Sequence, residues 1–151
     1  MHELYFAYGA NTNFDEMSRR CPAATPFGTA TLEGFRLCFK RAADIEPRAN
    51  KQVRGVLWYI TERCRQALDR FEGYPLVYTQ KQLQVQPDSG KRRLALAYLM
   101  TPRNFILPPD ADYLQCLREG YAHFGLPDAQ LNDALEHAEH HVNSPLDWDD
   151  Y

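Results

Sequence analysis

The sequence predicts an α+β fold, a small mixed or antiparallel β-barrel with flanking helices, in a single domain that spans residues 1–151. Strand-like stretches outnumber helical ones, and several of them follow one another as hairpins with few βαβ units. The helical stretches occur singly between strands or together near the end of the chain. A length of 151 residues, of which 44% are hydrophobic and 25% charged, suits one globular domain with a real core.

The first strand and the first helix lie at the start of the chain. Side chains of alternating polarity over residues 3–8 predict a strand. Asn13 and Glu16 have the spacing of a capping box, which predicts a short helix over residues 14–20. A turn at residues 9–13 therefore joins this strand directly to a helix.

Three strands are predicted next, and the third is the most apolar of the chain. Stretches 27–32 and 35–40 read as strands that are separated by a tight Glu-Gly turn at 33–34. Residues 42–52 are polar and predict a surface loop. The apolar run 53–60 predicts a central strand.

The second half of the chain begins with a helix over residues 62–72, which Gly73 ends as a C-terminal cap. Strands are predicted at 77–86 and 93–100, joined by a turn at 87–90.

Two helices are predicted near the C-terminus. The first begins at a cap, Asp110 or Asp112, and ends at Phe124. The second covers 128–141, and an irregular tail is expected over 143–151.

Composition excludes several classes of function. A net charge of −3 and a pI near 5.9 give no electrostatic reason to expect nucleic acid as a partner. No apolar stretch approaches the roughly 20 residues that a membrane helix needs, and no signal-peptide layout is present. We therefore expect a cytoplasmic protein. Four scattered cysteines without a C-x-x-C pair favour buried thiols over a zinc site.

The turn after the first strand, Tyr8-Gly9-Ala10-Asn11, is the first candidate site. A glycine-containing turn can direct successive backbone N–H groups into one concavity, which suits a carboxylate or a developing oxyanion. Most strand–Gly–Asn turns only redirect the chain, so the local pattern leaves both interpretations open.

Glu72 is the second candidate. At about 100° per residue it lies about 40° round its helix from Leu68, on the margin of the apolar face. It is also the last helical residue before Gly73, where the helix dipole disfavours an anion. Partial burial and the dipole both raise a carboxyl pKa, as general acid/base catalysis near neutral pH requires. A helix-end glutamate that reaches solvent is the alternative.

Three histidines near the C-terminus, His137, His140 and His141, include an i, i+4 pair that could bind a metal. No third ligand is evident, and we interpret them as a solvated helix end. No metal or cofactor is predicted.

These motifs, in this order, resemble the γ-glutamylcyclotransferase-like family. YFAYGAN resembles the family's N-terminal Tyr-Gly-Ser-Asn loop, and VRGVLWYITERCRQALDRFEGYPLVY resembles its strand–helix segment that ends in Glu-Gly. AYLMTP, Tyr113 and a helix that ends in GLP resemble its C-terminal part. The similarity covers about residues 4–127.

The resemblance implies a mixed barrel with one pocket and an acyltransferase, or lyase, of glutathione metabolism. It implies the conversion of a γ-glutamyl amide, amine or peptide into 5-oxoproline and a free amine, without cofactor, by a monomer or homodimer. Carried over by position, Glu72 would be the general acid/base. The cradle of the γ-glutamyl group would be Tyr8, Gly9, Ala10 and Asn11, and Tyr78 and Tyr98 are further candidates for pocket contacts.

Ala10 departs from the resemblance, because the family motif often has serine at this position. If the residue at this position binds substrate through its backbone N–H, alanine can replace serine without effect on the activity. If the serine hydroxyl binds substrate, we expect a different substrate preference in this protein. Two other hypotheses remain: a non-catalytic module of the same fold that binds a carboxylated small metabolite, and a purely structural role for both motifs. The second predicts that no cavity joins the turn to Glu72.

Overall fold

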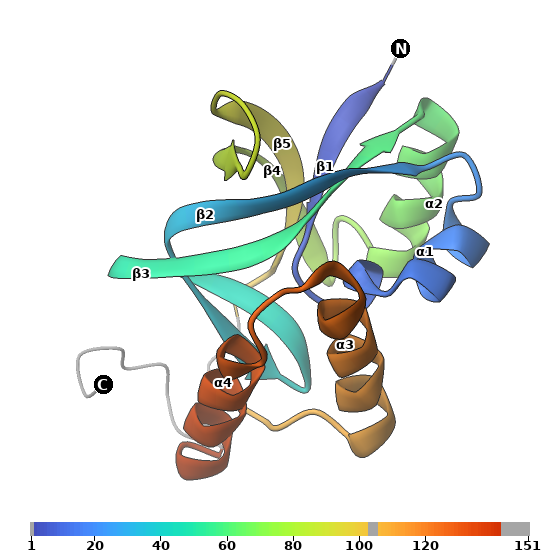
Figure 1. The fold of residues 1–151 in the computed structure, drawn as a ribbon. Helices are drawn as coiled ribbons and strands as arrows, with labels where there is room; N and C mark the ends of the chain where they lie inside the picture. The colour runs from blue at the N-terminus through green and yellow to red at the C-terminus, as the bar shows by residue number, and fades with distance from the viewer. Residues whose placement is uncertain (1, 103–105, 143–151) are drawn as a thin grey trace.

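A computed structural model of the chain describes residues 2–102 and 106–142, so the tail expected at 143–151 lies outside the described residues. Five strands form a closed barrel in the order β1-β3-β2-β4-β5, which confirms the predicted fold class (Figure 1). The strands are β1 (Glu3–Ala7), β2 (Thr25–Lys40), β3 (Ala42–Ile60), β4 (Tyr78–Pro87) and β5 (Arg93–Met100). The helices are the 3₁₀ helix η1 (Ala10–Thr12), α1 (Phe14–Arg20), α2 (Glu62–Glu72), α3 (Ala111–Phe124) and α4 (Asp128–His140).

The barrel closes through β1, the strand that has one antiparallel and one parallel neighbour. β1 pairs antiparallel with the end of β3, from Glu3 opposite Ile60 to Ala7 opposite Val56. Its other edge pairs parallel with β5 at Tyr5. The remaining pairs of the barrel are antiparallel.

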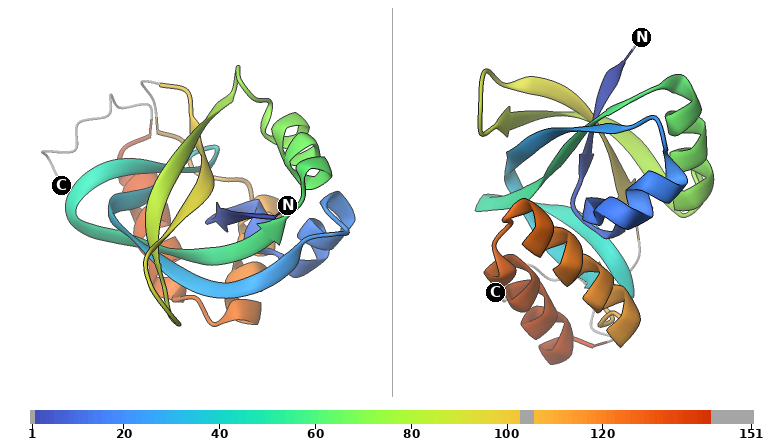
Figure 2. Two further views of the ribbon diagram at one scale, coloured as in Figure 1. Left: turned by 90° about the horizontal axis from the view of Figure 1, so that it is seen from above. Right: turned by 45° about the vertical axis from the view of Figure 1, so that its right-hand side comes forward.

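The helices cover two parts of the barrel. Figures 1 and 2 show α3 and α4 together at one end, below the β2–β3 ribbon, and α1 and α2 together on one flank. The predicted caps Asn13 and Asp110 form, since their side chains accept hydrogen bonds at the starts of α1 and α3, and Thr61 caps α2 in the same way. No helix among the described residues has the length and apolar character needed to cross a membrane.

β2 and β3 form one long ribbon, and two sequence predictions are wrong here. No turn forms at 33–34: β2 continues through these residues, and its register with β3 shifts between Glu33 and Phe35, where Gly34 adopts φ +81°. The loop expected over 42–52 is strand, because Phe35–Lys40 pairs with Ala42–Pro47 and Arg41 makes the turn at φ +69°. The loop prediction failed because two of the acidic side chains in this segment, Asp44 and Glu46, pair with Lys40 inside the protein.

A buried ion pair joins these side chains. The Lys40 ammonium lies 2.8 Å from Asp44 Oδ2 and also contacts the carboxylate of Glu46. Lys40 and Asp44 are only 2% and 1% exposed. The other oxygen of Asp44 accepts a hydrogen bond of 2.9 Å from the Met100 amide, which ties the ribbon's tip to β5.

Helix α3 packs directly on the turn that follows β1. A Cβ at Gly120 would lie 2.4 Å from Thr12 Oγ1 and 2.7 Å from the Asn13 amide nitrogen, so only glycine fits. The neighbouring Tyr121 hydroxyl donates a 2.8 Å hydrogen bond to the carbonyl of Tyr8. Helix α3 therefore holds both ends of the turn.

We expect Asp44→Ala to lower the free energy of unfolding by about 3–5 kcal/mol, because it leaves the Lys40 ammonium buried without its main partner. Urea unfolding measures the change. The control is Glu33→Ala, whose pair with Arg92 has side chains 67% and 63% exposed and should contribute about 0–1 kcal/mol. Equal losses in the two variants would contradict the prediction.

Gly120→Ala should lower the free energy of unfolding by about 1–3 kcal/mol, because the methyl group overpacks the contact with the turn. The loss is expected although alanine favours a helix over glycine by about 1 kcal/mol. Glu119→Ala, at the adjacent exposed position, is the control and should change stability by less than about 0.5 kcal/mol. A Gly120→Ala variant more stable than the wild type would show that α3 is not packed so closely.

Candidate active site

The turn after β1 is held in shape by its own hydrogen bonds. The Thr12 amide and hydroxyl both donate to the Gly9 carbonyl, at 3.0 and 2.7 Å. A Cβ at Gly9 would lie 3.1 Å from Ala43 Cβ and 3.3 Å from the Tyr113 hydroxyl oxygen. Glycine at this position thus allows the turn to approach the β3 strand and α3 closely.

Glu72 reaches this turn because of how α2 follows β3. β3 ends at Ile60, opposite Glu3 at the start of β1, and Arg65 in the first turns of α2 binds Glu3 at 2.9 Å. The eleven residues of α2 span about 16 Å, which is close to the length of the extended segment from Glu3 to Tyr8. The C-terminal end of α2 therefore lies near the end of β1, and Gly73 ends the helix at φ +64°.

The structure brings all seven sequence-predicted site residues to one cavity of about 160 Å³. Glu72 contributes the carboxyl group to its wall, and the turn contributes its backbone and short side chains. The predicted residues that line it are Tyr8, Gly9, Ala10, Asn11, Glu72, Tyr78 and Tyr98. The purely structural interpretation predicted no cavity between the turn and Glu72, whereas both line this one.

The Glu72 carboxyl has a raised pKa. Burial raises it from the ordinary 4.5 to about 7, and the positive charge of Arg20 acts in the opposite direction. Near neutral pH the group can therefore both accept and donate a proton.

The predicted tyrosines use their hydroxyl protons within the protein. Tyr8 donates to the Tyr98 carbonyl at 2.6 Å, and Tyr78 donates to the Ala43 carbonyl at 2.7 Å. The Tyr98 hydroxyl donates to the Asp69 carboxylate. Burial is the main cause that raises the pKa of all three. They form a neutral wall whose oxygen lone pairs can still accept hydrogen bonds.

Asn11 is fixed at both ends of its side-chain amide. Its Nδ2 donates to the Tyr5 hydroxyl at 3.0 Å, and its Oδ1 accepts from Arg20. The Trp58 indole donates to its backbone carbonyl at 3.0 Å. Asn11 is thus a rigid part of the turn.

Sequence reasoning missed five cavity residues: Tyr5, Ala42, Ala43, Phe71 and Tyr113. The two alanines were missed because their segment was predicted as a surface loop. Tyr113 stands in the first turn of α3, and its hydroxyl accepts from the Ala43 amide at 3.0 Å. The only available signal for Phe71 was its place beside Glu72.

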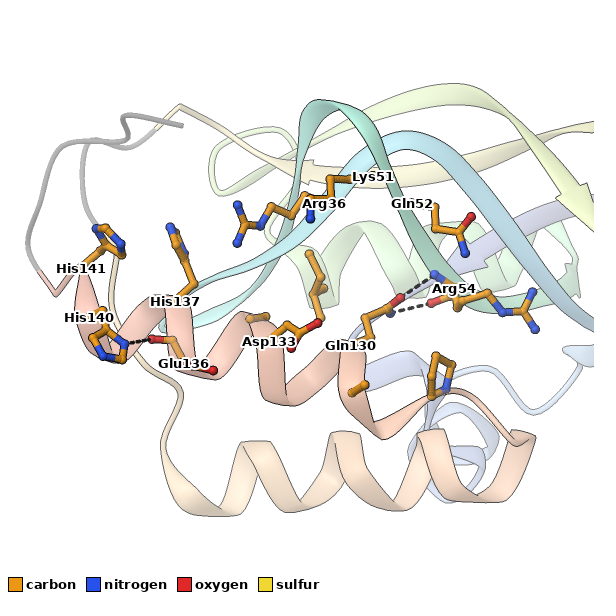
Figure 3. A pocket seen from close by; sticks show the side chains of 14 residues that line it. Arg36, Lys51, Gln52, Arg54, Gln130, Asp133, Glu136, His137, His140 and His141 are labelled. Atoms are coloured by element: carbon orange, nitrogen blue, oxygen red, sulfur yellow. Dashed lines mark hydrogen bonds between the residues drawn. The ribbon is translucent and has the colours of Figure 1, made fainter. Parts of the chain in front are cut away.

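A larger hollow of about 660 Å³ lies between α4 and the β2–β3 ribbon (Figure 3), and its lining includes none of the seven predicted site residues. Arg36, Lys51, His137 and His141 are among its lining residues. The prediction that His137 belongs to a solvated helix end is wrong, because α4 packs this face on the barrel and leaves His137 3% exposed. Burial, then Arg36, lowers the His137 pKa to about 4. His140 is exposed, as expected.

Within the described ranges, one group of side chains has the geometry of a metal site: Cys38, Asp44 and Glu46. The Lys40 ammonium already binds both carboxylates, so the position is occupied by a protein cation.

Comparison with known proteins places the chain in a family. The family model described as gamma-glutamyl cyclotransferase, AIG2-like matches residues 5–115. Gamma-glutamylcyclotransferase of Homo sapiens is 30% identical over 137 residues, which cover 82% of this chain and 72% of the human protein. The Bos taurus gamma-glutamylcyclotransferase is 28% identical over the same shares.

Solved structures agree with this assignment. A gamma-glutamyl cyclotransferase superposes with a TM-score of 0.79 at 27% identity, over 98% of this chain and 91% of its own. An uncharacterised Homo sapiens protein superposes with a TM-score of 0.78 at 28% identity, over 97% and 90%. The family model covers well over half of the sequence, so the chain belongs to the gamma-glutamyl cyclotransferase, AIG2-like family of enzymes.

Proposed function

We propose that the protein is a γ-glutamyl cyclotransferase with Glu72 as its general acid/base. It converts a γ-glutamyl amide, amine or peptide into 5-oxoproline and the free amine. The observation that carries the proposal is a carboxyl group with a pKa of about 7 on the wall of the cavity that the turn Tyr8–Asn11 also lines. Family membership supports the same activity.

The reaction needs no nucleophile from the protein. The α-amine of the substrate attacks its own γ-carbonyl carbon, which forms the ring C–N bond, and the bond to the leaving amine then breaks. Glu72 takes the proton from the attacking nitrogen and returns it to the leaving nitrogen, so one carboxyl group performs both transfers. A cavity wall that holds the substrate chain folded back on itself raises the effective concentration of the amine, which lowers the barrier by several kcal/mol.

The cavity suits the acyl part of such a substrate. A cavity of roughly 150 Å³ accepts a molecule of benzene's size, so about 160 Å³ has room for a short acyl chain. Phe71 lines the cavity and is 46% exposed, which places it at the opening. The glutamyl group would lie inside, and the leaving amine would point outward past Phe71.

The turn would bind the polar ends of the glutamyl group. Backbone N–H groups of Gly9, Ala10 and Asn11 are the candidates to stabilise the oxyanion or to bind the α-carboxylate. A role through backbone N–H groups is compatible with alanine at position 10, because no side-chain hydroxyl is then required.

Glu72→Gln should lower kcat by about 10²–10⁴-fold, because the amide cannot accept a proton. Release of 5-oxoproline from a panel of γ-glutamyl amino acids and amines measures the loss. Glu62→Gln, at the exposed start of the same helix, is the matched control and should leave kcat unchanged. Unchanged turnover in Glu72→Gln would refute the mechanism, and binding without turnover in the wild type would favour a non-catalytic module.

The pH dependence should follow the Glu72 carboxyl. The base acts in its ionised form, so kcat/KM is expected to fall about tenfold per pH unit below pH 7, the group's approximate pKa. A pH series of initial rates at low substrate concentration tests this. An acid limb with a midpoint near that of a free glutamate would show that the catalytic carboxyl is not buried as described.

A further inference from the structure

Arg20, the last residue of α1, contacts both sides of the candidate active site without lining the cavity. Its Nη1 donates a hydrogen bond to Asn11 Oδ1 in the turn after β1. Its guanidinium carbon lies 3.4 Å from the centroid of the Phe71 ring, in the last turn of α2. The side chain is 15% exposed, so these contacts are largely shielded from water.

We propose that Arg20 is the positioning residue of this site, which joins the substrate-binding turn to the end of α2 and so sets the distance between the turn and the Glu72 carboxyl. Its catalytic role rests on the function proposed above. Arg20 acts through Asn11 and Phe71, because it is not itself part of the cavity wall.

The guanidinium group is held in one orientation. On α1, Glu16 accepts from Arg20 Nη2 through Oε1 at 3.3 Å and from Nη1 through its carbonyl at 3.5 Å. The guanidinium group can only donate hydrogen bonds, so Asn11 Oδ1 must face Arg20, and Asn11 Nδ2 then donates to the Tyr5 hydroxyl. A planar fork that both hydrogen-bonds and stacks on a ring suits arginine and not lysine.

The charge of Arg20 also acts on the catalytic carboxyl. Arg20 favours the ionised form of Glu72, whereas burial favours the protonated form. Among the described residues, the other groups that interact electrostatically with Glu72 are tyrosines from β1, the turn after it, β4, β5 and α3, whose pKa values burial raises above the ordinary 10. They are Tyr5, Tyr8, Tyr78, Tyr98 and Tyr113. Near neutral pH these tyrosines are uncharged, so Arg20 is the charged group among those that interact with Glu72.

The test compares Arg20→Met and Arg20→Lys with Arg19→Met. Arg19 pairs with the same Glu16 but is 72% exposed, so its variant removes the same charge from the same helix without the two contacts. We expect Arg20→Met to raise KM for a γ-glutamyl amino acid about tenfold and to move the acid limb of kcat/KM upward by about 0.5–1 pH unit. Arg20→Lys should leave the midpoint of the acid limb at its wild-type pH but should still raise KM. Arg19→Met should match the wild type in both quantities.

A second readout does not depend on turnover. The ¹³C shift of the Glu72 carboxyl, assigned by its absence in Glu72→Gln, is titrated in the wild type and in the Arg20 variants. We expect a higher midpoint in Arg20→Met than in Arg20→Lys. A wild type without activity would refute the proposed function, and this titration would still decide the role of Arg20. Identical titration curves and KM values in Arg20→Met and Arg19→Met would overturn the proposal, and Arg20→Lys carries the KM comparison if Arg20→Met does not fold.

Discussion

The contact between helix α3 and the turn after β1 determines where the candidate active site lies. At Gly120 the helix comes so close to Thr12 and Asn13 that a single methyl group does not fit. One residue later, Tyr121 binds the carbonyl of Tyr8, so the same helix holds the turn at its start and at its end. Because the C-terminal third of the chain fixes the turn, the backbone N–H groups that we propose as substrate ligands would not have to be ordered by the substrate.

The barrel explains why residues sixty positions apart meet. Antiparallel pairing of β1 with β3 brings the end of β3 to the beginning of β1, and α2 then runs back along β1 for almost its full length. Arg65 anchors one end of the helix to β1, and Arg20 links the other end to the turn. The carboxyl of Glu72 is thus placed by element lengths and two arginines, which act at opposite ends of one helix.

Local patterns predicted most elements and the two segments that line the candidate site. The Asn13 cap, Gly73 and the marginal place of Glu72 on its helix are readable because each depends on near neighbours in sequence. The strand over residues 42–52 was not readable, since Asp44 becomes acceptable inside the protein only through Lys40 and the Met100 amide. The burial of His137 likewise depends on where α4 meets the barrel. Contacts with residues distant in sequence, such as these, produce no pattern in the local sequence from which they could be predicted.

The raised pKa of Glu72 has a consequence for folding as well as for catalysis. The native state retains this proton up to about pH 7, whereas the unfolded chain releases it near 4.5. Between these values each pH unit lowers the free energy of unfolding by about 1.4 kcal/mol, so that about 3 kcal/mol is lost by neutral pH, and nothing is lost below the lower value. The carboxyl group to which we assign proton transfer therefore destabilises the fold that holds it, so under the proposed mechanism thermostability and catalysis make opposite demands on position 72.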